Sequence, residues 1–147
     1  ETIDKLANEC KNIVGVKEAS GSLEQMSRIK ALCPRNFALI SGDDALTLPV
    51  LAIGGTGVIS VVSNVIPKDV ANMVEAFEKG NLKKAQELHY KILPLIKAMF
   101  IETNPIPVKT AMGLLKLCHP DLRLPMCEML AENQEKLKKA LKDYGLL

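Results

Sequence analysis

The sequence lacks a long, uninterrupted apolar run. Its longest uncharged stretch among 147 residues, 45–67, is broken by Pro49 and by a glycine cluster at 54–57. A membrane-spanning helix needs about 20 consecutive apolar residues. We therefore expect neither a transmembrane helix nor a signal peptide, and no membrane partner.

Metal-ligand spacing is also missing. Neither histidine, His89 or His119, is spaced as a ligand, and the cysteines form no C-x-x-C pair. The four cysteines are Cys10, Cys33, Cys118 and Cys127. We predict no metal site and no cofactor, and we interpret the cysteines as reduced core thiols of a cytoplasmic protein.

A concentrated basic region is the third missing feature. The formal charge of +2 is spread along the chain, and the one local cluster, 136–142, interleaves lysines with apolar residues. This pattern is typical of a solvated helix face, so nucleic acid is not an expected partner. The apolar fraction of 48% and the length suffice for a core of domain size.

Strand and helix signals alternate over the first 80 residues. The predicted strands are 12–17, 37–41 and 58–62, and their starts are roughly 20 to 25 residues apart. The predicted helices cover 1–10, 23–33, 45–53 with a bend at Pro49, and a segment opened by Pro67. Ser22 and Gln25 have capping-box spacing. This rhythm predicts right-handed βαβ units in a parallel sheet.

Beyond Gly80 only helices are predicted. A long helix follows Asn81 with a kink at Pro94, and the two prolines of 104–109 predict a rigid connection. Further helices are predicted at 108–117 and 126–142. We therefore divide the chain into a βα part, 1–80, and a helical domain, 81–147.

Polar clusters follow the three predicted strands, at 17–20, 41–44 and 63–64. In parallel βα architectures the carboxyl ends of the strands meet at one edge, where sites are built. Lys17 has two interpretations that the sequence leaves open. It is either a solvent-reaching lysine or, if its pKa is lowered in an apolar pocket, an amine nucleophile that forms a Schiff base.

Three other features have structural explanations that we prefer. Asp43 and Asp44 could be paired acid/base carboxylates, but aspartate just before a helix is more often a cap. The glycine cluster at 54–57 runs from helix to strand, the reverse of a phosphate-binding loop, so we predict a tight turn. His89 is expected to pack on a helix.

Five motifs together resemble the dihydrodipicolinate synthase (4-hydroxy-tetrahydrodipicolinate synthase) family, specifically its C-terminal half. In chain order they are Ile13-Val-Gly-Val-Lys-Glu-Ala-Ser-Gly21, Ser41-Gly-Asp-Asp44, Gly57-Val-Ile-Ser60, Asn104-Pro-Ile-Pro-Val-Lys109 and Leu122-Arg-Leu-Pro125. The resemblance covers essentially the whole chain. It implies a partial (β/α)8 TIM barrel, of which the last three strands with their helices are present, followed by a C-terminal helical domain.

The resemblance also implies a function. The family is a cytoplasmic, homotetrameric lyase that condenses pyruvate with aspartate semialdehyde in diaminopimelate and lysine biosynthesis. Lys17 would be the Schiff-base lysine, Ile59 would contact pyruvate, and Gly42 would lie beside the same pocket. The segment 104–109 would pack near the mouth of the site.

The resemblance leaves part of the family pattern unmatched. Three strands stand where eight close a barrel. The family's paired threonines, proton-relay tyrosines and substrate arginine belong to the N-terminal half, which would be the missing partner of this chain. We therefore expect a fragment that is inactive alone. Alternatives are another pyruvate-type class I aldolase, such as N-acetylneuraminate lyase or a keto-deoxy sugar acid aldolase, and a non-catalytic half-barrel module.

Overall fold

A computed structural model describes all 147 residues, which fall into two compact units. Unit 1 comprises residues 1–60 and 73–86, and unit 2 comprises residues 61–72 and 87–147. Helices α4 (Pro67–Glu78) and α5 (Leu82–Met99) contribute residues to both. The units thus interleave along the chain. The predicted division at Gly80 into a barrel part and a helical domain stays a prediction.

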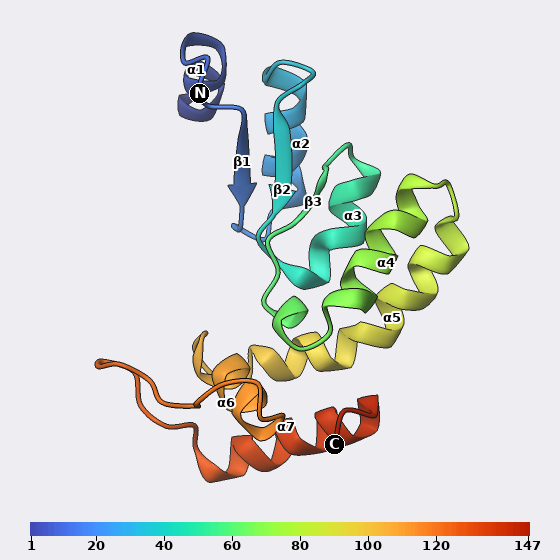
Figure 1. Cartoon of the computed structure of the whole chain (residues 1–147). Coiled ribbons are helices and arrows are strands. Elements are labelled where there is room, and N and C mark those ends of the chain that lie inside the picture. The colour runs from blue at the N-terminus through green and yellow to red at the C-terminus, as the bar shows by residue number, and fades with distance from the viewer. The chain divides into compact units, whose positions relative to one another are not determined.

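Unit 1 is built on a parallel three-stranded sheet with the order β1-β2-β3 (Figure 1). The strands are β1 (Gly15–Glu18), β2 (Ala38–Ser41) and β3 (Gly57–Val58). The predicted parallel sheet is confirmed. The predicted bounds were too wide, because β1 starts three residues later than expected and β3 ends at Val58 instead of Val62. Val62 opens a 3-10 turn, η2 (Val62–Asn64).

Three short α-helices accompany the sheet: α1 (Thr2–Glu9), α2 (Leu23–Leu32) and α3 (Thr47–Ala52). A 3-10 turn, η1 (Asp44–Leu46), precedes α3. The predicted helix over 45–53 is therefore confirmed for Thr47–Ala52, whereas residues 45–46 belong to the 3-10 turn. Pro49 lies in the first turn of α3, where its missing N–H is not needed, so the proline does not bend the helix.

The core of unit 1 lies between the sheet and its helices. Its buried side chains are Met26, Ile29, Phe37, Leu39 and Val50, against which Ile3, Ala7 and Val16 pack. The glycine cluster forms the predicted tight turn, in which Gly55 N–H donates to the carbonyl of Val50 at 2.8 Å and Gly54 has φ +92°. This turn ends α3 and leads the chain into β3.

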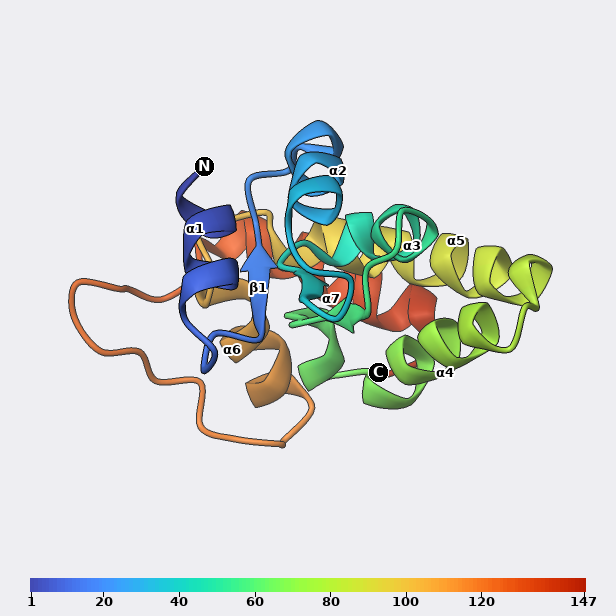
Figure 2. The same ribbon diagram turned by 90° about the horizontal axis from the view of Figure 1, so that it is seen from above.

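Unit 2 is helical. Helix α6 (Ile106–Leu114) contacts both η2 and α7 (Ala131–Tyr144). Two predicted bounds were wrong. The rigid connection at 104–109 gives way to helix at Ile106, because Pro107 lies in the first turn, where proline is tolerated. Helix α7 begins five residues later than predicted, after a long loop that leaves α6 and returns to α7 (Figure 2).

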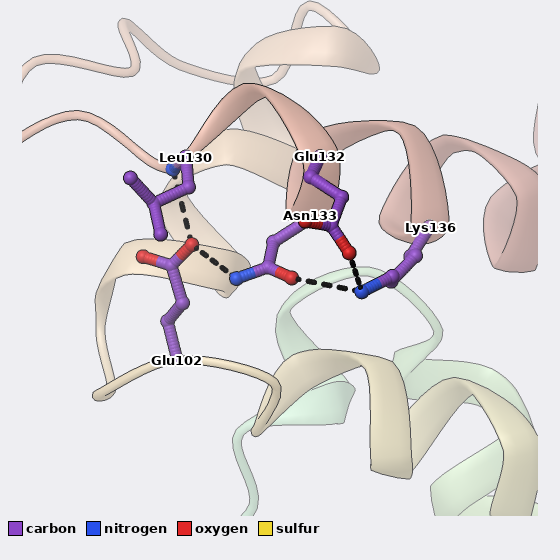
Figure 3. A network of polar contacts seen from close by, with 5 residues as sticks. All are labelled: Glu102, Leu130, Glu132, Asn133 and Lys136. Carbon is purple, nitrogen blue, oxygen red and sulfur yellow. Dashed lines mark hydrogen bonds and ion pairs between the residues drawn. The ribbon is translucent and has the colours of Figure 1, made fainter.

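Helix α7 has no side-chain cap of its own at Leu130. Glu102, which follows α5, supplies one (Figure 3). Its Oε1 accepts hydrogen bonds from the backbone N–H of Leu130 at 3.0 Å and from the side-chain amide of Asn133 at 2.8 Å. A carboxylate at a helix N-terminus is stabilised by the unpaired N–H groups and the helix dipole.

Other sequence predictions can be checked in the structure. All four cysteines are free, as predicted, but none is a fully buried core residue: Cys10, Cys33 and Cys118 are half-buried, and Cys127 is exposed. His89 lies on α5 with its Nδ1 buried and unpartnered, and burial lowers the pKa of its imidazole. None of the helices is long and apolar enough to cross a membrane.

Candidate active site

The side chains of β1 alternate between two faces of the sheet. Lys17 is exposed, whereas Glu18 is 6% exposed. In the register of the sheet, Lys17 lies opposite Ile40 and Glu18 lies opposite Ser41. Leu39 and Val16 face the helices and join the core, so the Glu18 face is covered and the Lys17 face is open within unit 1.

Gly42 lies directly beside the Lys17 side chain. A Cβ at position 42 would be 3.0 Å from Lys17 Cε and 2.5 Å from Ala19 Cβ, which is closer than such atoms approach. The backbone N–H of Gly42 donates to the carbonyl of Glu18 at 2.8 Å. The structure thus brings two predicted site residues together. Any side chain larger than that of glycine at position 42 would crowd the side chain of Lys17.

Ile59 belongs to the same face. Its N–H donates to the carbonyl of Ser41 at 2.9 Å, one position after the Val58–Ser41 pair. Alternation therefore turns Ile59 toward the Lys17 side of the sheet, two strands away, or roughly 10 Å at ordinary strand spacing. The Ile59 side chain is 51% exposed. Lys17, Gly42 and Ile59 thus share one open face.

The turn after β2 is fixed by its own side chains. Ser41 Oγ donates to the carbonyl of Asp43 at 2.7 Å and accepts from the Asp43 N–H at 3.2 Å. Asp43 Oδ1 accepts from the N–H of Ala45 at 2.8 Å. The cap interpretation of Asp43 is therefore confirmed, and Asp44 is buried at 3% exposure.

Of the two interpretations of Lys17, the amine nucleophile needs an apolar pocket, which unit 1 itself does not provide because this lysine is exposed. One sequence expectation needs correction. The third polar cluster, 63–64, does not end a strand, because β3 stops at Val58 and these residues lie in η2 of unit 2. The polar strand ends that form the site are those of β1 and β2.

One buried group was missed by sequence reasoning. Glu18 Oε2 accepts a hydrogen bond from the side-chain amide of Gln25 at 2.9 Å. Half of the predicted capping box is present, since Ser22 Oγ accepts from the Gln25 N–H at 3.1 Å. The other half is replaced, because the Gln25 side chain binds Glu18. The spacing of Ser22 and Gln25 was a signal for the cap but not for this partner.

Lys17 lies at the carboxyl edge of a parallel βα sheet, which is the edge where βα-barrel enzymes build their sites. The comparisons with known proteins point to the same class. The Dihydrodipicolinate synthetase family profile matches residues 1–144. A 4-hydroxy-tetrahydrodipicolinate synthase of Endomicrobium trichonymphae is 66% identical over 146 residues, which are 99% of this chain and 50% of that protein.

Solved structures agree as well. The dihydrodipicolinate synthase of Aquifex aeolicus matches with a TM-score of 0.96 and 47% identity, covering 99% of this chain and 50% of that one. The chloride-inhibited Acinetobacter baumannii synthase, solved with pyruvate, matches with a TM-score of 0.93 and 34% identity over the same shares. This chain belongs to the dihydrodipicolinate synthetase family, and it spans about half the length of these relatives.

Proposed function

We propose that this chain supplies the imine-forming lysine of a 4-hydroxy-tetrahydrodipicolinate synthase, which condenses pyruvate with aspartate semialdehyde in diaminopimelate and lysine biosynthesis. The observation that carries the proposal is the placement of Lys17 at the carboxyl end of β1, on the open face, with Gly42 beside its Cε. The names of the relatives support the synthase over the sugar-acid aldolases, and one related synthase was solved with pyruvate.

The chemistry follows from an amine held beside a carbonyl. Lys17 Nζ attacks the keto carbon of pyruvate, and loss of water leaves a protonated imine. The iminium nitrogen then accepts the electron pair released when a proton leaves the pyruvate methyl group, which gives an enamine. The enamine carbon attacks the aldehyde carbon of the semialdehyde and forms the new carbon–carbon bond.

The remaining roles follow from position. Gly42 leaves room for the lysine and its bound substrate, and Ile59 offers an apolar contact to pyruvate on the same face. The rest of a closed barrel would cover this face and exclude water. In the full-length protein we expect a cytoplasmic homotetramer.

Borohydride reduction in the presence of pyruvate tests the proposal on the full-length protein. A Schiff base reduced in place becomes a stable secondary amine, which peptide mass spectrometry locates. We expect the adduct on Lys17. Absence of an adduct, or an adduct on another lysine, would overturn the assignment.

Two variants serve as controls for this experiment. Lys17→Arg keeps the positive charge but cannot form an imine, so it should abolish trapping. Lys30→Arg changes a lysine of α2 whose Nζ donates to the carbonyl of Phe37 at 3.3 Å, and it should trap as wild type. Turnover of pyruvate with aspartate semialdehyde, compared with other aldehydes, then separates the synthase from related aldolases.

A further inference from the structure

A buried carboxylate follows Lys17 directly and faces the opposite side of the sheet. Glu18 Oε1 accepts from the backbone N–H of Ser20 at 2.8 Å, and Oε2 accepts from the Gln25 side-chain amide at 2.9 Å. Both oxygens therefore have a donor. A buried carboxylate without hydrogen-bond partners would strongly destabilise the fold, so Glu18 can be buried only because both oxygens are bonded.

The donors to Glu18 belong to one hydrogen-bonded turn. The N–H of Ser22 donates to Ser20 Oγ at 3.2 Å, and Ser22 Oγ accepts from the N–H of Gln25 at 3.1 Å. Gln25 is thus held at its backbone by Ser22 and at its side chain by Glu18. Residues 18–25 form a connected unit between the end of β1 and the first turn of α2.

The Glu18 carboxylate is in its charged form at neutral pH. Burial by itself raises the pKa of this group, but the hydrogen bonds from Gln25 and Ser20 outweigh burial, so the pKa is lowered from that of an ordinary glutamate. Hydrogen bonds to a charged acceptor are roughly twice as strong as neutral ones. The turn is therefore held more firmly by a carboxylate than by an amide.

This turn borders the lysine. The Glu18 carbonyl accepts the Gly42 N–H, and Ala19, the next residue, already lies so close to Gly42 that an added Cβ there would be 2.5 Å from Ala19 Cβ. The same added atom would be 3.0 Å from Lys17 Cε. If the turn shifted, Ala19 would move relative to Gly42, and the space available to the Lys17 side chain would change.

We propose that Glu18 is a positioning residue for the reaction at Lys17: its buried carboxylate fixes the turn 18–25, and through Ala19 and Gly42 it fixes the path of the lysine side chain. This inference rests on the proposed function of Lys17. Glu18 itself faces away from the substrate side and acts only through its neighbours.

Glu18→Gln in the full-length enzyme is the primary test. The variant keeps the size of the side chain, but a glutamine has one acceptor oxygen where the carboxylate has two. One of the two hydrogen bonds from Ser20 and Gln25 is therefore lost, together with the negative charge. We expect the rate of borohydride-trappable imine formation and kcat to fall by about tenfold or more, because small misplacements of a reacting group are costly. KM for pyruvate should change less than kcat.

The exchanged pair, Glu18→Gln with Gln25→Glu, restores one carboxylate and one amide to the same contact. We expect it to recover most of the imine rate. Glu24→Gln is the matched control, since Glu24 is exposed in the first turn of α2, and it should react as wild type.

The outcomes separate this inference from the proposed function. If wild-type protein forms no adduct on Lys17, the proposed function fails. If wild type forms the adduct and Glu18→Gln forms it at the same rate, only the positioning role is overturned. It is also overturned if the exchanged pair recovers the thermal midpoint but not the imine rate, because Glu18 would then serve stability alone.

Discussion

Tyr144 in α7 donates a hydrogen bond to the carboxylate of Asp69 in α4, across 75 positions of the chain. Lys91 of α5 reaches the same carboxylate at 2.6 Å, and its ammonium lies 4.8 Å from the centre of the Tyr144 ring. One carboxylate therefore joins three helices. These contacts all lie in unit 2.

This contact predicts a pH-dependent contribution to stability. The hydrogen bond from Lys91, with that from Tyr144, lowers the pKa of Asp69 below its ordinary value. A lowered carboxyl pKa stabilises the fold above about pH 4, and the gain is lost as pH falls through the folded pKa. Asp69→Asn should therefore lower the urea midpoint at pH 7, and this loss should shrink progressively as pH falls below about 4 through the folded pKa. Asp121→Asn, at an exposed position, should not shift the midpoint at any of these pH values. A loss that stays constant across the acid titration would contradict the ionic explanation.

Removal of the Glu102 carboxylate, which caps α7, should destabilise this helix. Glu102→Ala takes away the acceptor for Leu130 N–H and for the Asn133 amide, so we expect a loss of about 1 kcal/mol in the free energy of unfolding. Urea denaturation measures it. Glu128→Ala, an exposed acid of the preceding loop, is the control, and equal effects from the two variants would refute the capping role.

Crowding at Gly42 can be tested by a compensating pair. Gly42→Ala should destabilise the fold by about 1–3 kcal/mol, because its Cβ would overlap Ala19 Cβ and press on Lys17 Cε. Ala19→Gly removes the nearer of these atoms, so the double variant should regain part of the thermal midpoint. Imine trapping should recover less, since the contact with Lys17 persists. Additive losses in the double variant would show that the two sites do not collide.

Ile59 allows substrate contact to be separated from folding. Ile59 is half exposed in the 147-residue chain, so Ile59→Ala should change the thermal midpoint of this chain little, while KM of the full-length enzyme for pyruvate rises. Melting curves of the 147-residue chain and steady-state kinetics of the full-length enzyme measure the two effects. Unchanged KM would remove Ile59 from the proposed site. Leu39→Ala, at a fully buried position on the opposite face, should do the reverse and mainly destabilise the protein.

The 147-residue chain by itself should show no synthase turnover. Its sheet has three strands and leaves Lys17 exposed, so nothing in unit 1 excludes water from the lysine. A coupled assay with both substrates measures this, with the full-length protein as the positive control. Turnover by the purified chain at a rate comparable to that control would contradict the prediction.

Much of the fold follows from local sequence signals. The alternation of strand and helix predicted the parallel sheet, and Pro67 and Ser22 correctly marked two helix starts. These signals succeed because caps and proline act within a few residues. The start of α7 was missed because its cap, Glu102, lies 28 positions away from Leu130.

The site was predictable only in part for the same reason. The polar residues at the ends of β1 and β2 indicated Lys17 and the Asp43 turn, since the position of a strand end can be read from its own residues. Gly42 and Ile59 were indicated only by the family resemblance. The partnership of Glu18 with Gln25 depends on how a strand end meets the next helix. It has no short-range signal beyond the Ser22 spacing, which indicated only the backbone half of the contact.

The alternation along β1 has a consequence for how such a protein can change over time. Glu18 and Val16 belong to the packed side of the sheet, while Lys17 shares the open side with Ile59. Under the proposed function, variation on the open side would therefore alter which carbonyl compounds are accepted without changing the packed side. A change at Glu18 would instead affect the packed side and, through the turn 18–25, the lysine as well.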